Sequence, residues 1–214
     1  MSEAKNTKYE ITDIAHEKDP FLHRIRALRD FGDVKAGDLG GFVEGEFNLS
    51  FEPDDISWIY NDAIAAGCSV VEKDSRLYDK AITCDESCVS MGSVLRGSAR
   101  AEDQVYIRGA VMRDNARASG DAMILNLADT NMGPELSENC VVYGKVSGGA
   151  SIRGGVIVFY PEEIANASLD RFLINDQGRT VVRSESRNEL RPRPQKGKTP
   201  EKAKSHSKAR RSAR

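Results

Sequence analysis

Histidine is scarce in this chain of 214 residues. Its three copies are His16, His23 and His206, and none of them lies in the long middle segment. Enzymes that transfer groups to hydroxyls or amines often use a histidine as general base, so this scarcity disfavours such catalysis in the middle of the chain. The sequence also lacks the GxxxxGK[ST], GxSxG and HExxH motifs, which disfavours a phosphate-binding loop, a serine hydrolase and a zinc protease.

Cysteine is equally sparse and is poorly spaced for metal binding. Cys68, Cys84, Cys88 and Cys140 form no CxxC pair, so we expect reduced, small apolar side chains and no metal site. No apolar run approaches the roughly 20 residues of a membrane span. Residues 1–6 lack the apolar stretch of a signal peptide. These absences predict a cytoplasmic protein without a membrane partner.

The sequence does contain a six-residue repeat between Ala63 and Ile107, in which a small residue is followed two places later by an aliphatic one. The small position holds Ala63, Ser69, Ser75, Ala81, Ser87, Ser93, Ala99 and Val105, and the second position holds Ala65, Val71, Leu77, Thr83, Val89, Leu95, Ala101 and Ile107. Steps of two and six place side chains on one face of an extended chain that bends regularly, whereas a helix shows steps of three and four. The repeat therefore predicts a solenoid of very short strands. We expect Leu77, Val89, Leu95 and Ile107 to point inward.

The repeat changes phase once and then breaks. After Ile107 the small position arrives one residue early, at Ala110, so we expect a bulge or a tightened corner near residues 108 and 109. The pattern is lost over residues 126–137, which we interpret as a loop thrown out from the coil, and it resumes imperfectly from Cys140. Loops on a rigid scaffold often carry function, although a tolerated insertion explains this one as well.

These hexads resemble the left-handed parallel β-helix of hexapeptide-repeat proteins, whose units combine an aliphatic and a small residue. The sequence departs from that family after the aliphatic position, where residues such as Tyr78 and Arg96 replace the usual small or acidic one. The resemblance implies an all-β fold with triangular coils of three hexads, hence about five coils over residues 58–159. It also implies a homotrimer. In the family's enzymes it implies acyl-CoA chemistry with a histidine on or beside the coil.

A second resemblance lies upstream of the coil. Residues 22–31 and 33–43, which read LHRIRALRDF and DVKAGDLGGFV, are similar to the opening block of YdcK-like transferases and related phage or prophage proteins. The open end of a solenoid exposes strand edges and apolar side chains, so we expect residues 1–57 to form an N-terminal cap. Within it we expect a short strand over residues 25–27 and a glycine-rich turn over residues 37–42.

Charge is divided unevenly along the chain. Residues 187–214 hold eleven Lys or Arg and two acidic residues, a net charge of +9, whereas the rest of the chain carries −11. Almost no apolar residue lies in this basic tail, so we expect it to be disordered. It either binds nucleic acid in a salt-dependent manner or serves solubility or self-association. Its expected nucleic-acid contacts are Lys204, Lys208, Arg210 and Arg211.

Four segments and two functional hypotheses follow. We expect a cap (1–57), a hexapeptide-repeat β-helix (58–160), a C-terminal packing segment (161–186) and the tail (187–214). In the first hypothesis the chain is a non-catalytic oligomeric scaffold, phage- or prophage-associated by resemblance, which binds a host macromolecule or a small ligand without a cofactor. Its expected contacts are Arg26, Arg29, Asp30 and Asp38, a charged cluster beside a glycine turn.

In the second hypothesis the chain is an acyltransferase that uses acetyl-CoA or another acyl-CoA in the cleft between adjacent coils. His23 would then be the general base, oriented by Asp30 or Asp38. The lack of histidine in the repeat favours the non-catalytic hypothesis.

Overall fold

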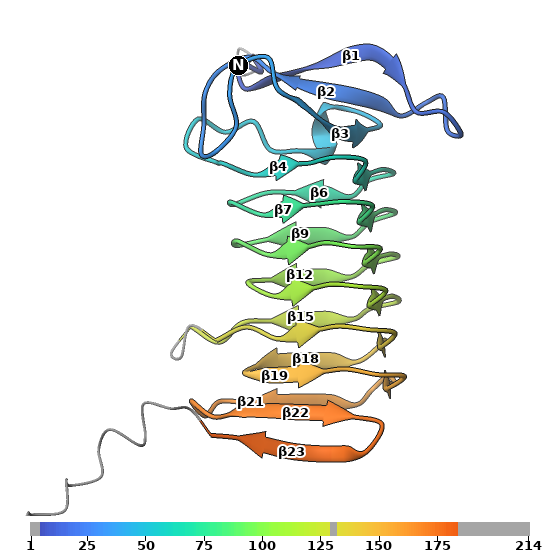
Figure 1. Ribbon diagram of the computed structural model, residues 1–214, viewed down its shortest axis with the longest axis vertical. Coiled ribbons are helices and arrows are strands. Elements are labelled where there is room, and N and C mark those ends of the chain that lie inside the picture. The colour runs from blue at the N-terminus through green and yellow to red at the C-terminus, as the bar shows by residue number, and fades with distance from the viewer. Residues whose placement is uncertain (1–4, 129–131, 184–214) are drawn as a thin grey trace, which may run out of the picture. The chain divides into compact units, whose positions relative to one another are not determined.

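The hexads form short parallel strands that stack coil on coil. This computed structural model describes residues 5–128 and 132–183, and in it the successive strands are distributed over three sheets (Figure 1). Ile64 pairs with Ile82, and Val70 with Cys88, each across 18 residues, so three hexads make one coil. The chain is an all-β parallel solenoid, as the repeat predicts. No helix in the described ranges is long and apolar enough to cross a bilayer.

The strands divide among these three sheets. The first sheet holds β1 (Tyr9–Ala15), β2 (His23–Ala27), β3 (Leu39–Val43), β5 (Ile64–Ala65), β8 (Ile82–Thr83), β11 (Arg100–Ala101), β14 (Arg117–Ala118), β17 (Val141–Val142) and β20 (Ile157–Val158). The second holds β4 (Trp58–Ile59), β7 (Arg76–Leu77), β10 (Val94–Leu95), β13 (Val111–Met112), β16 (Glu135–Leu136), β19 (Ala150–Ile152), β22 (Arg171–Asn175) and β23 (Gly178–Val182). The third holds β6 (Val70–Val71), β9 (Cys88–Ser90), β12 (Tyr106–Arg108), β15 (Met123–Leu125), β18 (Lys145–Gly148) and β21 (Glu163–Asn166). One 3-10 turn, η1 (Glu46–Asn48), is the only helical element among the described residues.

The core is a column of aliphatic side chains inside the coil. Leu77, Val89, Leu95 and Ile107 have no exposed surface, which confirms that they point inward. Each such side chain contributes about 1.5 to 3 kcal/mol when fully buried. Parallel pairing continues beyond residue 160, because β21 pairs with β18 and β22 pairs with β19.

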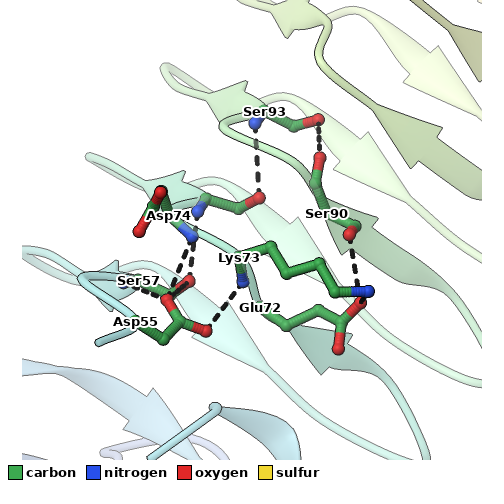
Figure 2. Close-up of polar contacts among 8 residues, drawn as sticks. Asp55, Ser57, Glu72, Lys73, Asp74, Ser90 and Ser93 are labelled. Carbon is green, nitrogen blue, oxygen red and sulfur yellow. Dashed lines mark hydrogen bonds and ion pairs between the residues drawn. The ribbon is translucent and has the colours of Figure 1, made fainter. Parts of the chain in front are cut away.

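Buried serines at the small positions link one coil to the next. The backbone N–H of Ser75 donates to the Ser57 hydroxyl at 3.1 Å, and that of Ser93 donates to the Ser75 hydroxyl at 3.3 Å. The Ser93 hydroxyl in turn donates to the Ser90 carbonyl at 2.6 Å, as Figure 2 shows. Serine therefore fills the crowded corner and offers a hydroxyl acceptor to the backbone N–H one coil later, in addition to the bond that Ser75 N–H makes to the Glu72 carbonyl at 3.3 Å.

Asp55 begins this ladder at the first coil. Its carboxylate accepts hydrogen bonds from the backbone N–H groups of Ser57, Lys73 and Asp74 at 2.7, 2.7 and 3.0 Å (Figure 2). Burial alone raises the pKa of Asp55, but these bonds and the Ser57 hydroxyl outweigh it and hold the pKa at about 2. The Asp55 carboxylate thus supplies the hydrogen-bond acceptors that the corner of a preceding coil would otherwise provide.

The phase change is a tightened corner. Between β9 and β10 the chain turns through Met91 and Gly92, both at positive φ, whereas between β12 and β13 it turns through Gly109 alone, at φ 56°. A Cβ on Gly109 would lie 2.5 Å from the side-chain nitrogen of Asn126, so this corner requires glycine. The expected tightening near residues 108 and 109 is confirmed.

The excursion after β15 is shorter than expected. β16 pairs in parallel with β13, and Leu136 has no exposed surface, so the coil resumes at Glu135 and not at Cys140. Leu136 fills the aliphatic position, but Pro134 stands two residues before it, where most other hexads have a small residue. The predicted loop over residues 126–137 is therefore wrong at its C-terminal end.

The N-terminal end of the coil is covered by an antiparallel sheet made of β1, β2 and β3. Tyr9 and Trp58 are each only 1% exposed beneath it, and the Trp58 ring packs edge-on against Phe31 at 5.3 Å between centroids. The Tyr9 hydroxyl donates to the Leu49 carbonyl at 2.8 Å. We call the segment that contains β1, β2 and β3 the cap; the predicted domain boundary at residue 57 stays a prediction.

Two glycines of the cap lie in a strand, not in the predicted turn. Gly40 and Gly41 belong to β3, and a Cβ on Gly40 would lie 2.6 Å from the Ile25 side chain and 2.7 Å from the Ile59 carbonyl. They are glycines because β3 lies directly on the core, with no room for a side chain.

Candidate functional site

A groove of about 640 Å³ lies where the loop after β1 approaches the outer face of the first sheet. Its apolar surface comes from Ile14, Phe42, Ile64 and Ile82. Ile64 and Ile82 are half-buried at outward positions of β5 and β8, so they form an apolar strip that a ligand can cover. The polar groups around the strip are those of His16, Glu17, Lys18, Asp19, Arg24, Asp62 and Lys80.

Arg24 fixes one side of the groove. Its guanidinium donates to the carbonyls of Gly40 and Asn61 and to the Asp62 carboxylate, each at 2.8 Å. The guanidinium also stands 4.2 Å from the centroid of the Phe42 ring, a cation–π contact. Arg24 is therefore a structural tie between the cap and the first coil.

His16 also contacts Phe42, edge-on to its ring at 4.8 Å between centroids. The Asp19 backbone N–H donates to His16 Nδ1 at 3.2 Å, whereas the Asp19 carboxylate is 3.3 Å from the same nitrogen. An amide always carries its proton, so Nδ1 is the acceptor and the neutral ring bears its hydrogen on Nε2. We assign the tautomer from this bond. His16 then offers a donor, and the carboxylate contact would require the opposite tautomer.

Lys18 and Lys80 complete the groove as cations that make no ion pair within the described ranges. Together with His16 they place hydrogen-bond donors around an apolar strip. Such an arrangement suits a ligand that has both an apolar part and an acceptor or anionic part.

The four predicted contact residues lie elsewhere in the cap, and none of them lines the groove. Arg26 pairs with Glu10 at 3.1 Å, and Arg29 donates to the Pro53 carbonyl at 2.8 Å. Asp30 and Asp38 are brought together by one short turn.

In that turn Asp30 accepts from the Ala36 N–H at 2.9 Å and from the Lys35 ammonium at 3.0 Å, and these bonds lower the pKa of Asp30. The Asp38 carboxylate accepts the Lys35 N–H at 2.8 Å. These bonds hold the cap together. The binding role of Arg26, Arg29, Asp30 and Asp38 stays a prediction.

The remaining predicted residues are not brought into a site. His23 lies in β2, paired with Ala15 and Val43, and within the described residues it makes no hydrogen bond or ion pair with Asp30 or Asp38. The predicted nucleic-acid contacts Lys204, Lys208, Arg210 and Arg211 lie outside the described residues. Sequence reasoning passed over His16, because the pairing of β1 with β2 that places it at the groove leaves no signature in residue spacing.

Comparison with known proteins gives one partial match. The chain is 35% identical over 92 residues to the uncharacterized acetyltransferase YdcK of Escherichia coli (strain K12). The match covers 42% of this chain and 24% of that protein, so the alignment spans about a quarter of the relative's length. No family model matches the chain. The repeat, the parallel solenoid and this similarity together fit a hexapeptide-repeat β-solenoid protein.

Proposed function

We propose that this chain is a non-catalytic β-solenoid that binds a small amphipathic ligand in the groove beside His16. Phe42, Ile64 and Ile82 would contact the apolar part of the ligand, and His16 and Lys80 would donate to its polar part. The hydrogen bond from the Asp19 amide to His16 Nδ1 carries this proposal, because it leaves Nε2 protonated and unable to act as a base.

The tautomer can be measured directly. Long-range ¹H–¹⁵N NMR spectra distinguish the two ring nitrogens of His16, with His16→Gln to assign the signals. We expect the hydrogen on Nε2 near neutral pH, and native mass spectrometry of the purified protein to reveal a co-purified ligand that is absent from His16→Gln. A hydrogen on Nδ1 would contradict the non-catalytic assignment.

Acyl transfer is the second candidate, favoured by the similarity to an acetyltransferase and by the Asp19 carboxylate 3.3 Å from His16 Nδ1. With the hydrogen on Nδ1, that carboxylate would orient the ring and Nε2 would be free to accept a proton from an attacking amine or hydroxyl. Acetyl-CoA would then be the donor. Release of the CoA thiol that is lost in His16→Ala but kept in His23→Ala would establish this activity and overturn the first proposal.

We also propose that the solenoid self-associates. A narrow coil buries little surface for its length, and such chains gain stability from partners. The number three comes from the family resemblance alone. Light scattering at micromolar concentration should report a mass near three chains, and a monomer would contradict it. Association with phage, or with a host macromolecule, stays a prediction from resemblance.

A further inference from the structure

Two arginines lie side by side on the two strands that follow Ile82 in the first sheet. Arg100 of β11 and Arg117 of β14 are paired residues on adjacent strands of the first sheet. Both contact Glu102, whose Oε1 is 2.6 Å from Arg100 Nε and whose Oε2 contacts Arg117 Nη2. The Glu102 side chain is 11% exposed, whereas the two arginine side chains are about half exposed.

The arginine pair keeps unused donors. Glu102 occupies only part of each guanidinium, so further N–H donors of Arg100 and Arg117 remain for another acceptor. Hydrogen bonds from the Ser119 hydroxyl and the Gly120 N–H lower the pKa of Asp103, and the charge of Arg117 lowers it further. The formal charges of the two arginines are thus balanced by Glu102 and Asp103, but the Asp103 carboxylate is held by Ser119 and Gly120. Among the described residues no other carboxylate forms an ion pair with either arginine.

The arginine pair continues the apolar strip of the groove. Ile82 is the paired neighbour of Arg100 in the first sheet, and Ile64 is that of Ile82. Strands of a sheet lie about 4.8 Å apart, so Arg100 and Arg117 follow Ile82 at roughly 5 and 10 Å along the same face. A ligand of that length can contact both features at once.

We propose that Arg100 and Arg117 bind the phosphate of a ligand whose alkyl part lies on Ile64 and Ile82. This rests on the proposed function of the groove, and it names the ligand class as an alkyl phosphate, whose phosphate is a polar group additional to the one that His16 and Lys80 contact. Guanidinium groups match phosphate oxygens through paired N–H donors. Glu102 holds both arginines in place, so little side-chain freedom is lost when the phosphate binds.

Octyl phosphate and inorganic phosphate are suitable probes, with binding to the full chain followed by NMR titration. Arg100→Gln and Arg117→Gln should each weaken octyl phosphate binding roughly tenfold, as expected for a charge-assisted hydrogen bond. Arg100→Lys, which keeps the charge but loses the fork, should weaken it less. Arg96→Gln is the matched control, because Arg96 is exposed and follows β10 of the second sheet. The affinity of Arg96→Gln for octyl phosphate should equal that of the parent chain.

The outcomes separate the arginine pair from the groove. The role of the arginine pair would be overturned if Arg100→Gln and Arg117→Gln bound octyl phosphate as tightly as the parent chain. An equal loss of affinity in Arg96→Gln would overturn it too. Either result would hold even if Ile82→Ser weakened the binding of octyl phosphate. Equal affinity of the parent chain for octyl phosphate and inorganic phosphate would contradict the contact between the alkyl chain and the groove. If the arginine variants then bound both probes more weakly, phosphate binding by the arginine pair would still be supported. Octanoate that binds as tightly as octyl phosphate would contradict the choice of phosphate. Melting temperatures of the variants check that each one is folded.

Discussion

The ammonium of Lys8 donates a hydrogen bond of 2.8 Å to the carbonyl of Ser50, and the lysine has no exposed surface. The same ammonium stands 5.1 Å from the centroid of the Phe31 ring. Burial lowers the pKa of Lys8 to about 8, although the carboxylate of Asp55 acts in the opposite direction. This lysine joins the cap to the first coil, and its charge is costly there.

The first prediction is that Lys8 contributes more to stability as the pH rises through the range in which it titrates. The folded pKa of about 8 lies below the unfolded value of 10.5, so between these values the unfolded chain binds more protons and unfolding becomes less favourable as pH rises. The gain should be on the order of 2 kcal/mol. Above about pH 9 two thiols work against this gain, because burial raises the pKa of Cys84 to about 12 and that of Cys140 to about 11 from an ordinary 9.0. Above pH 10 the raised pKa of Tyr9 adds to their effect, so the contribution of Lys8 is the difference from a variant that lacks it. Urea unfolding at pH 7, 8, 9 and 10 measures the slope.

Lys8→Met is the control for that experiment. It removes the titrating group but keeps an unbranched side chain, so its stability should rise less between pH 8 and 10 than that of the parent chain. Identical slopes in the two proteins would show that Lys8 keeps its ordinary pKa.

The second prediction concerns acid. The pKa of Asp55 is lower in the folded protein, about 2, than its ordinary 3.8, so its stabilisation is present above about pH 4 and is lost as pH falls towards 2. Asp55→Asn should lower stability at pH 7 by on the order of 2 kcal/mol, because both carboxylate oxygens accept backbone N–H groups and the side-chain NH2 group of Asn would face either Lys73 N–H or the N–H groups of Ser57 and Asp74. Denaturant unfolding at pH 7 and 3 should show the difference shrinking in acid. A difference that grows in acid would disprove the mechanism.

The third prediction tests the interior of the coil. Val89→Asp would place a carboxylate among buried aliphatic side chains, at a cost of several kcal/mol. Val94→Asp is the matched control, because Val94 is only partly buried. Thermal unfolding followed by circular dichroism should show a much larger fall for Val89→Asp. Equal melting temperatures in the two variants would refute the inward orientation of Val89.

The fourth prediction concerns the basic tail, which the sequence alone suggests. Deletion of residues 187–214 should leave the melting temperature and the oligomer mass unchanged. If the tail binds nucleic acid, the deletion should abolish binding, and the affinity of the full chain should fall steeply between about 50 and 200 mM salt. Binding that survives the deletion would assign recognition to the rest of the chain.

The coil was predictable because its information is local. A buried position recurs at a fixed spacing, so Leu77, Leu95 and Ile107 can be assigned inward without knowledge of the rest of the fold. The same reasoning fails at Glu135, because a hexad with Pro134 at its small position does not stand out after a break. It also fails at Gly40, where glycine reflects tight packing and not a turn.

The groove was not predictable in the same way. His16 and Phe42 are far apart in sequence and come together only because β1, β2 and β3 pair as antiparallel strands. The arginine pair is an intermediate case. Arg100 and Arg117 align only when the single residue missing at the Gly109 corner is taken into account. The spacing of Ala110 contains that information, but it does not reveal that two charges share one carboxylate.

The corner that is tightened at Gly109 is also the corner that opens into the excursion one coil later, after β15. Strands on both sides keep their pairing in either case. The number of residues in these stacked corners therefore does not affect how the strands of successive coils pair. Segments can be inserted or removed there without shifting the remaining hexads. For a protein engineer, the stretch between Leu127 and Met132 is therefore the natural place to graft a foreign peptide.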